Sequence, residues 1–210
     1  MAGIIIGPIM DEALTGLGMP VPDSALARRA RELIGDVAAP VLVNHSIRCY
    51  AWGVELARHD GLQFDPEVLY VSSLLHDIGL VPAYDLGGCY EVDGAIAAEG
   101  LAREAGAVED RVRAIYDVIA LHNDDELPAG CAVEVTLLWD AAGVDVTGER
   151  FADLRPEIVP AVLAAHPTLD FKREFTTLFV DQATRKRTCP AAAMAAAGIL
   201  DEIAQAPFDS

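Results

Sequence analysis

Apolar residues recur at intervals of three and four through most of the chain, and sustained alternation of apolar and polar residues is nearly absent. This spacing is typical of helices with one buried face, so the sequence predicts an all-α fold. Helix start and stop signals leave irregular segments at 1–20 and 80–90. The helices are expected at 22–34, 41–59, 65–77, 93–105, 111–121 and 134–142, followed by helices over 150–203 that prolines interrupt.

The segment 65–77 is apolar on nearly all sides. It begins with an aspartate, a proline and a glutamate at 65–67, which suit the N-cap and first turn of a helix. A helix of this composition is expected to be central and buried. It ends at His76 and Asp77, just before Gly79, which accepts the left-handed backbone of a helix end. A buried Asp77 requires a cation.

The helix expected over 41–59 places polar side chains within an apolar stripe. At a period of 3.6 residues, His45, Arg48, Cys49 and Trp52 fall on one face. A buried histidine and arginine need partners, and a metal ion would explain the burial of His45. One turn away, Arg48 is placed to pair with a ligating carboxylate, to contact the substrate or to form an ordinary salt bridge.

Together with Asp145, which lies among apolar residues, these side chains form an ordered set: His45, the doublet His76-Asp77, and Asp145. The set resembles the motif of the HD-domain metal-dependent hydrolase superfamily, a histidine, a later His-Asp doublet and a distant aspartate. The resemblance covers about 38–150. It implies an HD-domain helical bundle around a metal site, with His45, His76, Asp77 and Asp145 as ligands of one divalent transition metal.

Shorter segments narrow the resemblance to the cyanamide hydratase branch of this superfamily. They are 45–48 with Trp52-Gly53, 91–95, 119–122 and 143–146. HD proteins with two metals typically add two histidines between the doublet and the last aspartate, but here only His122 lies there. The resemblance therefore implies one metal and leaves His122 free to orient the substrate or transfer a proton. The alternative is a helix-end histidine without a chemical role.

Two imidazoles and two carboxylates suit zinc, and also iron(II), manganese or nickel. Such a metal lowers the pKa of bound water from 15.7 to about 7 and so supplies hydroxide. In one reaction class, hydroxide adds to the carbon of a small nitrile, as in the conversion of cyanamide to urea, with His122, Arg48 and Asp77 as catalytic residues. In the other, it attacks the phosphorus of a nucleotide or other phosphate ester. The complete set of four ligands disfavours a third interpretation, binding without turnover.

The charge of the chain distinguishes these reactions. Its 15 basic and 33 acidic residues give a net charge of −18, which argues against nucleic acid as a partner and against phosphate substrates. Arg48 is the only Lys or Arg within a turn of a predicted ligand. The sequence therefore favours a neutral small-molecule substrate and the hydratase, with the phosphohydrolase as the alternative.

Length and composition predict the remaining properties. With 210 residues and 52% apolar composition, residues 1–210 are expected to form a single HD domain, the metal core with N-terminal and C-terminal helical extensions. No apolar run approaches the roughly 18 residues of a membrane helix, and no basic residue precedes the apolar start, so we expect a cytoplasmic protein without membrane contact. A homo-oligomer is compatible with the sequence. Reduced thiols are expected at the widely spaced cysteines, Cys49, Cys89, Cys131 and Cys189.

Overall fold

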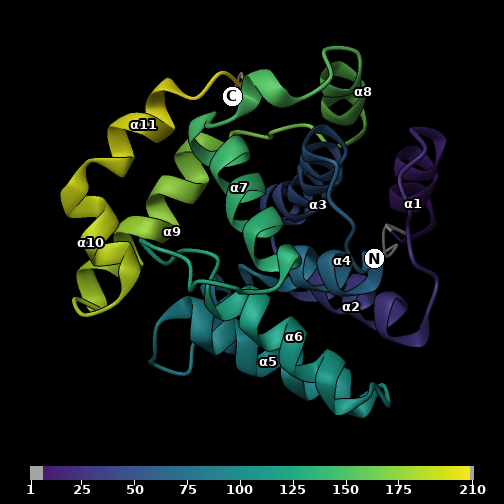
Figure 1. Ribbon diagram of the computed structural model, residues 1–210. Coiled ribbons are helices and arrows are strands. Elements are labelled where there is room, and N and C mark those ends of the chain that lie inside the picture. Colours follow the sequence, from purple (N-terminus) through teal and green to yellow (C-terminus); the bar gives the residue numbers. More distant parts are fainter. Residues whose placement is uncertain (1–6, 209–210) are drawn as a thin grey trace, which may run out of the picture.

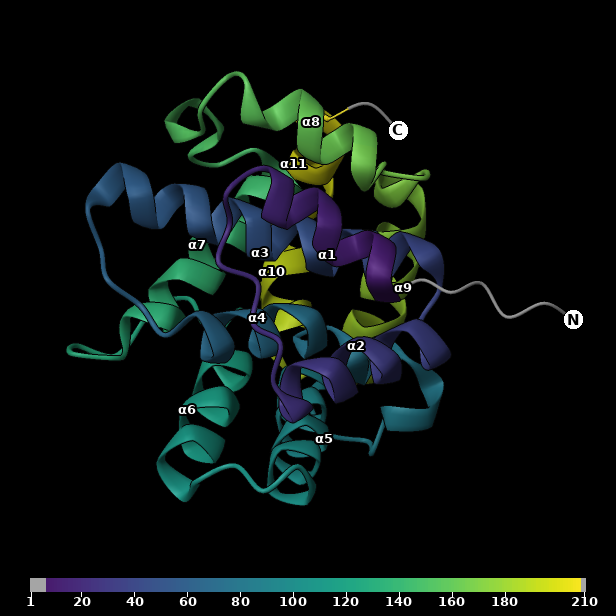
Figure 2. The same cartoon turned by 90° about the vertical axis from the view of Figure 1, so that its right-hand side faces the viewer.

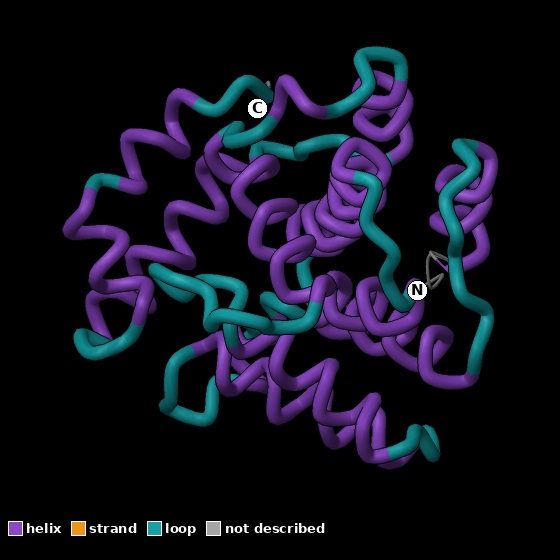
Figure 3. Tube along the Cα trace, viewed as in Figure 1, coloured by secondary structure: helices purple, strands orange, loops and turns teal. Residues whose placement is uncertain are grey.

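A computed structural model describes residues 7–208 of the chain (Figure 1). These residues form helices and loops and contain no strand (Figure 3), which confirms the predicted all-α fold. None of the described helices is long and apolar enough to span a membrane. The helices are α1 (Gly7–Gly16), α2 (Ala25–Val37), α3 (Pro40–Asp60), α4 (Pro66–Leu75), α5 (Tyr90–Glu104), α6 (Glu109–Ala120), α7 (Val133–Thr147), α8 (Ile158–Ala165), α9 (Phe171–Arg185), α10 (Pro190–Ala197) and α11 (Ile199–Gln205). Short 3-10 helices lie at Ile78–Leu80, Pro82–Tyr84 and Phe151–Asp153.

The helix α4 is buried at the centre of the fold, as its apolar sequence predicts. Asp65 caps its N-terminus by accepting the backbone N–H groups of Glu67 at 2.9 Å and of Val68 at 3.3 Å. Every residue over 68–75 is buried, and the helix packs against α2, α3, α5, α6 and α7. These neighbours fix its C-terminal end, and with it the doublet that follows.

Gly79 is required at this helix end for a different reason from the predicted one. Its backbone is not left-handed, but a Cβ atom there would lie 2.1 Å from the carbonyl oxygen of Tyr90 and 3.0 Å from the backbone nitrogen of Gly94. Only a residue without a side chain allows the 3-10 turn at 78–80 to pack this closely against α5. The close contact brings the first turn of α5 next to the doublet.

The N-terminal region is more regular than its glycines and prolines suggest. The segment expected to be irregular over 1–20 contains α1, and α2 continues through Gly35 to Val37. α1 lies between α2 and α8 (Figure 2), where Leu14 is 1% exposed. Burial of an apolar side chain against the core therefore outweighs the weak helix propensity of this segment.

The last three helices, α9, α10 and α11, lie together beside α7 (Figure 1). They build a second apolar cluster, in which Phe171, Phe175 and Phe179 recur on one face of α9 and meet Val41 and Leu42 of α3. Aromatic residues four apart share a helix face, so α9 presents a continuous ridge to α3. The C-terminal region thus covers one end of the central helices.

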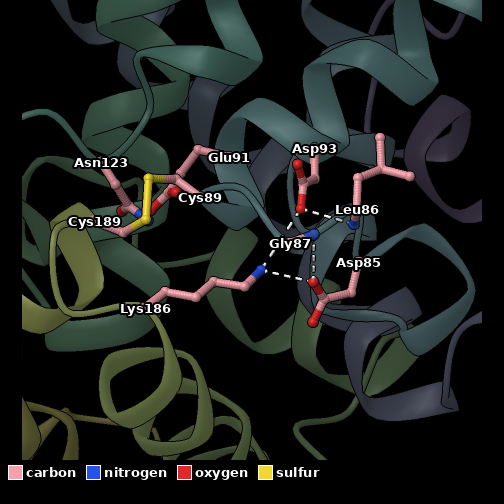
Figure 4. Close-up of a disulfide and its surroundings, with 9 residues drawn as sticks. All are labelled: Asp85, Leu86, Gly87, Cys89, Glu91, Asp93, Asn123, Lys186 and Cys189. Atoms are coloured by element: carbon pink, nitrogen blue, oxygen red, sulfur yellow. Dashed lines mark hydrogen bonds and ion pairs between the residues drawn. A yellow bond between two sulfur atoms is a disulfide. The ribbon is translucent and has the colours of Figure 1, made fainter.

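A disulfide joins this C-terminal cover to the start of α5 (Figure 4). Cys89 and Cys189 are bonded, with their Cα atoms 5.3 Å apart, whereas Cys49 and Cys131 are free thiols. The prediction of reduced thiols is therefore wrong for Cys89 and Cys189. A sequence separation of 100 gave no sign that two helix N-termini meet here, and the pairing weakens one argument for a cytoplasmic location.

Ion pairs reinforce the same junction. The Lys186 ammonium lies 2.9 Å from Asp85 Oδ1 and 3.6 Å from Asp93 Oδ2, and Arg185 lies 2.8 Å from Asp85 Oδ2. Figure 4 shows the lysine reaching from the end of α9 into the loop that precedes α5. The ammonium and the guanidinium lower the pKa of Asp85 to about 2, with the Lys186 ammonium as the largest cause. Arg185 and Lys186 at the end of α9 therefore link the C-terminal helices to the loop that precedes α5.

We expect loss of the disulfide to destabilise the protein. Cys189→Ser should lower the free energy of unfolding by about 2–4 kcal/mol, because the unfolded chain regains the freedom that the cross-link removes. The matched control is Cys131→Ser, which changes a free, half-buried cysteine. Denaturant unfolding monitored by circular dichroism measures both. Equal stabilities of the two variants would show that the cross-link is absent in solution or contributes nothing.

Candidate metal centre

Four buried side chains converge where α3, α4 and α6 meet. His45 comes from α3, His76 and Asp77 follow α4, and His122 follows α6; each is 1–2% exposed. His45 Nε2 lies 3.2 Å from His76 Nε2 and 3.3 Å from Asp77 Oδ2. His76 Nε2 is 3.4 Å from Asp77 Oδ2, and His122 Nε2 is 3.7 Å from Asp77 Oδ1. The structure thus brings His45, His76 and Asp77 together as predicted and adds His122.

Hydrogen bonds fix the same tautomer in all three imidazoles. His45 Nδ1 donates to Asp145 Oδ2 at 2.7 Å. His76 and His122 each donate from Nδ1 to the carbonyl oxygen three residues earlier, at 2.8 Å and 2.6 Å. Because each Nδ1 carries the proton, each Nε2 of a neutral ring has a free lone pair. The three lone pairs are therefore available as ligands around Asp77.

This donor set fits a divalent metal ion. Neither carboxylate oxygen of Asp77 accepts a hydrogen bond from the described residues, although both are buried. An unpaired buried carboxylate is costly, and two imidazole lone pairs facing each other at 3.2 Å repel unless a cation lies between them. Ligand atoms of a tetrahedral zinc site, about 2.0–2.1 Å from the metal, are roughly 3.3 Å apart. Distances of 3.2, 3.3 and 3.4 Å between His45, His76 and Asp77 match this spacing.

Asp145 occupies a different position from the one that the motif implied. Its Oδ1 accepts hydrogen bonds from Arg48 Nε at 2.8 Å and Trp52 Nε1 at 2.7 Å, and its Oδ2 accepts from Arg48 Nη2 and His45 Nδ1, both at 2.7 Å. All four acceptor positions of the carboxylate are filled. In this geometry the carboxylate orients the His45 ring through the hydrogen bond to its Nδ1 atom. The role of Asp145 as a metal ligand stays a prediction.

The Arg48 guanidinium donates all of its described hydrogen bonds to Asp145 and to two backbone carbonyl groups. Its side chain is 0% exposed and pairs in bidentate fashion with Asp145. Its remaining nitrogen donates to the backbone carbonyls of His166 and Pro167, each at 3.2 Å. Burial alone would raise the pKa of Asp145, but the guanidinium outweighs burial and holds this pKa far below its usual range. Of the three predicted partners of Arg48, the structure shows a carboxylate beside the site, and a contact with substrate stays a prediction.

Cys49 lies against His45, and its thiol is grouped with His45 and His76 as a possible metal ligand. Its Sγ atom is 3.7 Å from both ring nitrogens of His45. Burial raises the pKa of the Cys49 thiol, which favours the protonated form, so we assign Cys49 to the packing around the imidazole. The free thiol agrees with the reduced cysteine expected at this position.

Residues 42–163 match the family model described as the HD domain, and this match spans more than half of the chain. The chain belongs to the HD domain family. It is also similar to two cyanamide hydratases of Saccharomyces cerevisiae, DDI2 and DDI3, each 28% identical over 185 residues that cover 85% of this chain and 82% of the relative. These similarities confirm the predicted resemblance to the cyanamide hydratase branch and support an enzyme of the hydratase or hydrolase class.

The C-terminal cover of this HD protein contacts its candidate metal centre. The Phe171 ring stacks on the His45 imidazole with a centroid distance of 4.5 Å, and the Phe175 ring lies 5.7 Å from it. No site was predicted after residue 150, because the resemblance to the family covers only about 38–150. The two rings exclude water from one side of the site, so the described C-terminal region is part of the site's enclosure.

A buried carboxyl group, Glu91, joins the site from the first turn of α5. Its side chain accepts a hydrogen bond from Asn123 Nδ2 at 3.3 Å through Oε1, while Oε2 accepts none from the described residues. Asn123 also donates to the Tyr90 hydroxyl. Burial raises the pKa of Glu91, and the neighbouring charge of His122 partly offsets this. From the sequence, an acidic residue at this position could either reach the site or cap α5, and the burial of Glu91 with its bond to Asn123 supports the first use. Asn123 was not among the predicted site residues.

A cavity of about 250 Å³ opens beside His122, between α7 and the C-terminal helices. Its apolar and aromatic walls include Trp139, Ala142, Val146, Phe175, Phe179, Met194 and Ile199. Four carboxylate side chains also line it: Asp124, Asp125, Glu149 and Glu202. Among the described residues of its lining, none is Lys or Arg. This cavity is the candidate substrate pocket of the HD protein.

Proposed function

We propose that this HD protein is a metal-dependent hydratase that adds water to the carbon of a small nitrile, with cyanamide converted to urea. The observation that carries the proposal is the lining of the pocket beside His122, which has four carboxylates and no Lys or Arg among its described residues. A phosphate ester would bring its negative charges next to these carboxylates. Arg48, the nearby cation, is occupied by Asp145 and two carbonyl groups. The cyanamide hydratase names of the yeast relatives agree with a nitrile substrate.

One divalent metal would be held by His45, His76, Asp77 and His122. Three imidazoles and one carboxylate suit zinc, and iron(II), manganese and nickel are compatible with the same donors. When bound, the metal supplies a Lewis acid that lowers the pKa of water from 15.7 to about 7. Asp145 and the carbonyls behind His76 and His122 keep the three rings oriented for this role.

The chain's own contribution to the chemistry is proton transfer. Hydration forms a bond between the water oxygen and the nitrile carbon, and both water protons pass to the nitrile nitrogen, so that cyanamide becomes urea. A group that accepts a proton from water and returns it to nitrogen is needed. Glu91 is suited to this role because it is buried, has a free Oε2 atom and is held by Asn123. In this proposal Glu91, and not His122, is the residue that transfers the proton.

The test is product formation by the purified, zinc-loaded protein. Incubation with cyanamide should yield urea, and His76→Ala should yield none above the uncatalysed rate. A parallel panel of nucleotides and p-nitrophenyl phosphate examines the alternative, an HD-type phosphohydrolase. Phosphate release without urea formation would replace the hydratase with that alternative.

Glu91→Gln should lower kcat for cyanamide by at least about a hundredfold, the usual minimum for loss of a positioned acid or base. The amide keeps the size of the side chain and its hydrogen bond to Asn123, so metal content should stay at the wild-type level. Glu99→Gln, which neutralises a carboxylate elsewhere on α5, is the control. Unchanged turnover in Glu91→Gln would remove Glu91 from the mechanism, and a parallel loss of metal would indicate a structural effect.

A further inference from the structure

Within the described part of the chain, no Lys or Arg forms an ion pair with the four carboxylates of the pocket. Asp124 and Asp125 follow α6, Glu149 follows α7 and Glu202 lies on α11, so separate parts of the chain bring them to one cavity. No ion pair links any of them to a Lys, Arg or His among residues 7–208. This differs from the arginine-rich junctions elsewhere in the fold, since Arg150 alone pairs with three carboxylates. Asp125, Glu149 and Glu202 are exposed and Asp124 is half-buried, so the negative charge lies at the mouth of the pocket next to the candidate metal centre.

The cavity is also larger than cyanamide requires. At about 30 Å³ for each water-sized group, its volume of 250 Å³ holds about eight such groups, and N≡C–NH₂ fills less than half of it. The remaining space is bounded by apolar and aromatic side chains, among them Trp139, Phe175 and Phe179. Methylene groups favour such walls, and aromatic faces also attract cations.

We propose that the pocket selects nitriles that carry a protonated amine on a short apolar chain. The nitrile would lie toward His122, the methylene groups along the aromatic walls and the ammonium among the carboxylates. This inference rests on the proposed function, since it names the substrate class of the same site. Opposite charge at the pocket would attract such a substrate and disfavour anionic nitriles.

The test compares substrates that differ mainly in charge. 4-Aminobutyronitrile and pentanenitrile have the same number of non-hydrogen atoms, but only the first is cationic at neutral pH; 3-cyanopropanoate supplies the anion. With the zinc-loaded protein, kcat/KM should be at least about tenfold higher for the amine than for pentanenitrile, equivalent to about 1.4 kcal/mol. The anion should be the poorest substrate, and added salt should reduce the differences. Equal values for the three nitriles, or a preference for the neutral or anionic one, would overturn the inference.

Charge-neutralising variants locate the preference in the pocket. Glu149→Gln combined with Glu202→Gln should reduce the ratio of kcat/KM between the amine and pentanenitrile by at least about fivefold, or about 1 kcal/mol. The control is Glu12→Gln combined with Glu32→Gln, which removes the same charge from α1 and α2, outside the pocket lining. This control should keep the wild-type ratio. A ratio that falls equally in both double variants would assign the preference to the overall charge of the protein and overturn the inference.

Binding without turnover separates this inference from the proposed function. Titration calorimetry of the zinc-loaded protein should detect pentylammonium more strongly than pentan-1-ol, which has the same chain length and no charge. Preferential binding of the ammonium with no hydration of any nitrile would support the cationic pocket and refute the hydratase. Urea formation from cyanamide without preference for the ammonium or the amine would support the hydratase and refute the cationic pocket.

Discussion

His122→Ala is expected to lose its bound metal together with its hydratase activity. The Nε2 atom of His122 faces Asp77 at 3.7 Å, and its Nδ1–H is held by a backbone carbonyl at 2.6 Å, which is the arrangement of a ligand. Removing an outer partner of a ligand already costs about 10–100-fold in metal affinity. Loss of a ligand should cost more than a hundredfold, measured by metal analysis after dialysis and by competition with a chelator.

The matched control for this variant is His59→Ala. The His59 imidazole lies at the exposed end of α3, 3.8 Å from Asp153 with its side chain 49% exposed, and it has no contact with the donor set. Its removal should leave metal content and kcat unchanged. If His122→Ala keeps a full metal complement but loses kcat, His122 is a proton-transfer residue and the ligand set proposed here is wrong.

Arg48→Leu is expected to lower the free energy of unfolding by about 3–5 kcal/mol, the range observed when one partner of a buried ion pair is removed. Asp145 would then remain fully buried with two fewer donors. For a chain of this length, that change corresponds to a fall in melting temperature of about 6–20 °C. Thermal unfolding of the metal-free proteins measures the effect without a contribution from metal binding.

The control pair for Arg48 is Arg28 with Asp23, which lie 2.8 Å apart with side chains 51% and 82% exposed. Arg28→Leu should cost no more than about 1 kcal/mol, because exposed ion pairs contribute little. A stability loss in Arg48→Leu no larger than that in Arg28→Leu would mean that Asp145 is neutral, or solvated, in the folded protein. The supporting role assigned to the pair would then fail.

The sequence predicts local features of this fold well and tertiary features less well. The apolar run over 68–75 and its Asp65 cap identify α4 and its burial, since both signals lie within one turn or one helix. α1 was missed because its stability depends on packing against α2 and α8 rather than on its own propensity. The disulfide was missed for a similar reason, because its cysteines meet only after the C-terminal helices have folded back.

In the candidate metal centre, too, the sequence predicts the local features better than the tertiary ones. An adjacent His76-Asp77 pair at a helix end is a local signal, and His45 within an apolar stripe is another. Which of His122 and Asp145 faces the common centre depends on the rotation of two helices and on the position of Arg48, and the spacing of residues contains neither. The sequence also does not show that Glu91 reaches the site, because an acidic residue in the first turn of a helix usually interacts with the helix N-terminus.

X-ray absorption spectroscopy of the purified protein tests the ligand set most directly, because the fine structure at the K edge of the bound metal reports the number of imidazole ligands. We expect three imidazoles and one carboxylate in the wild-type protein, from His45, His76, His122 and Asp77. Two imidazoles in the wild-type spectrum, unchanged in His122→Ala, would contradict this set and return Asp145 to the metal.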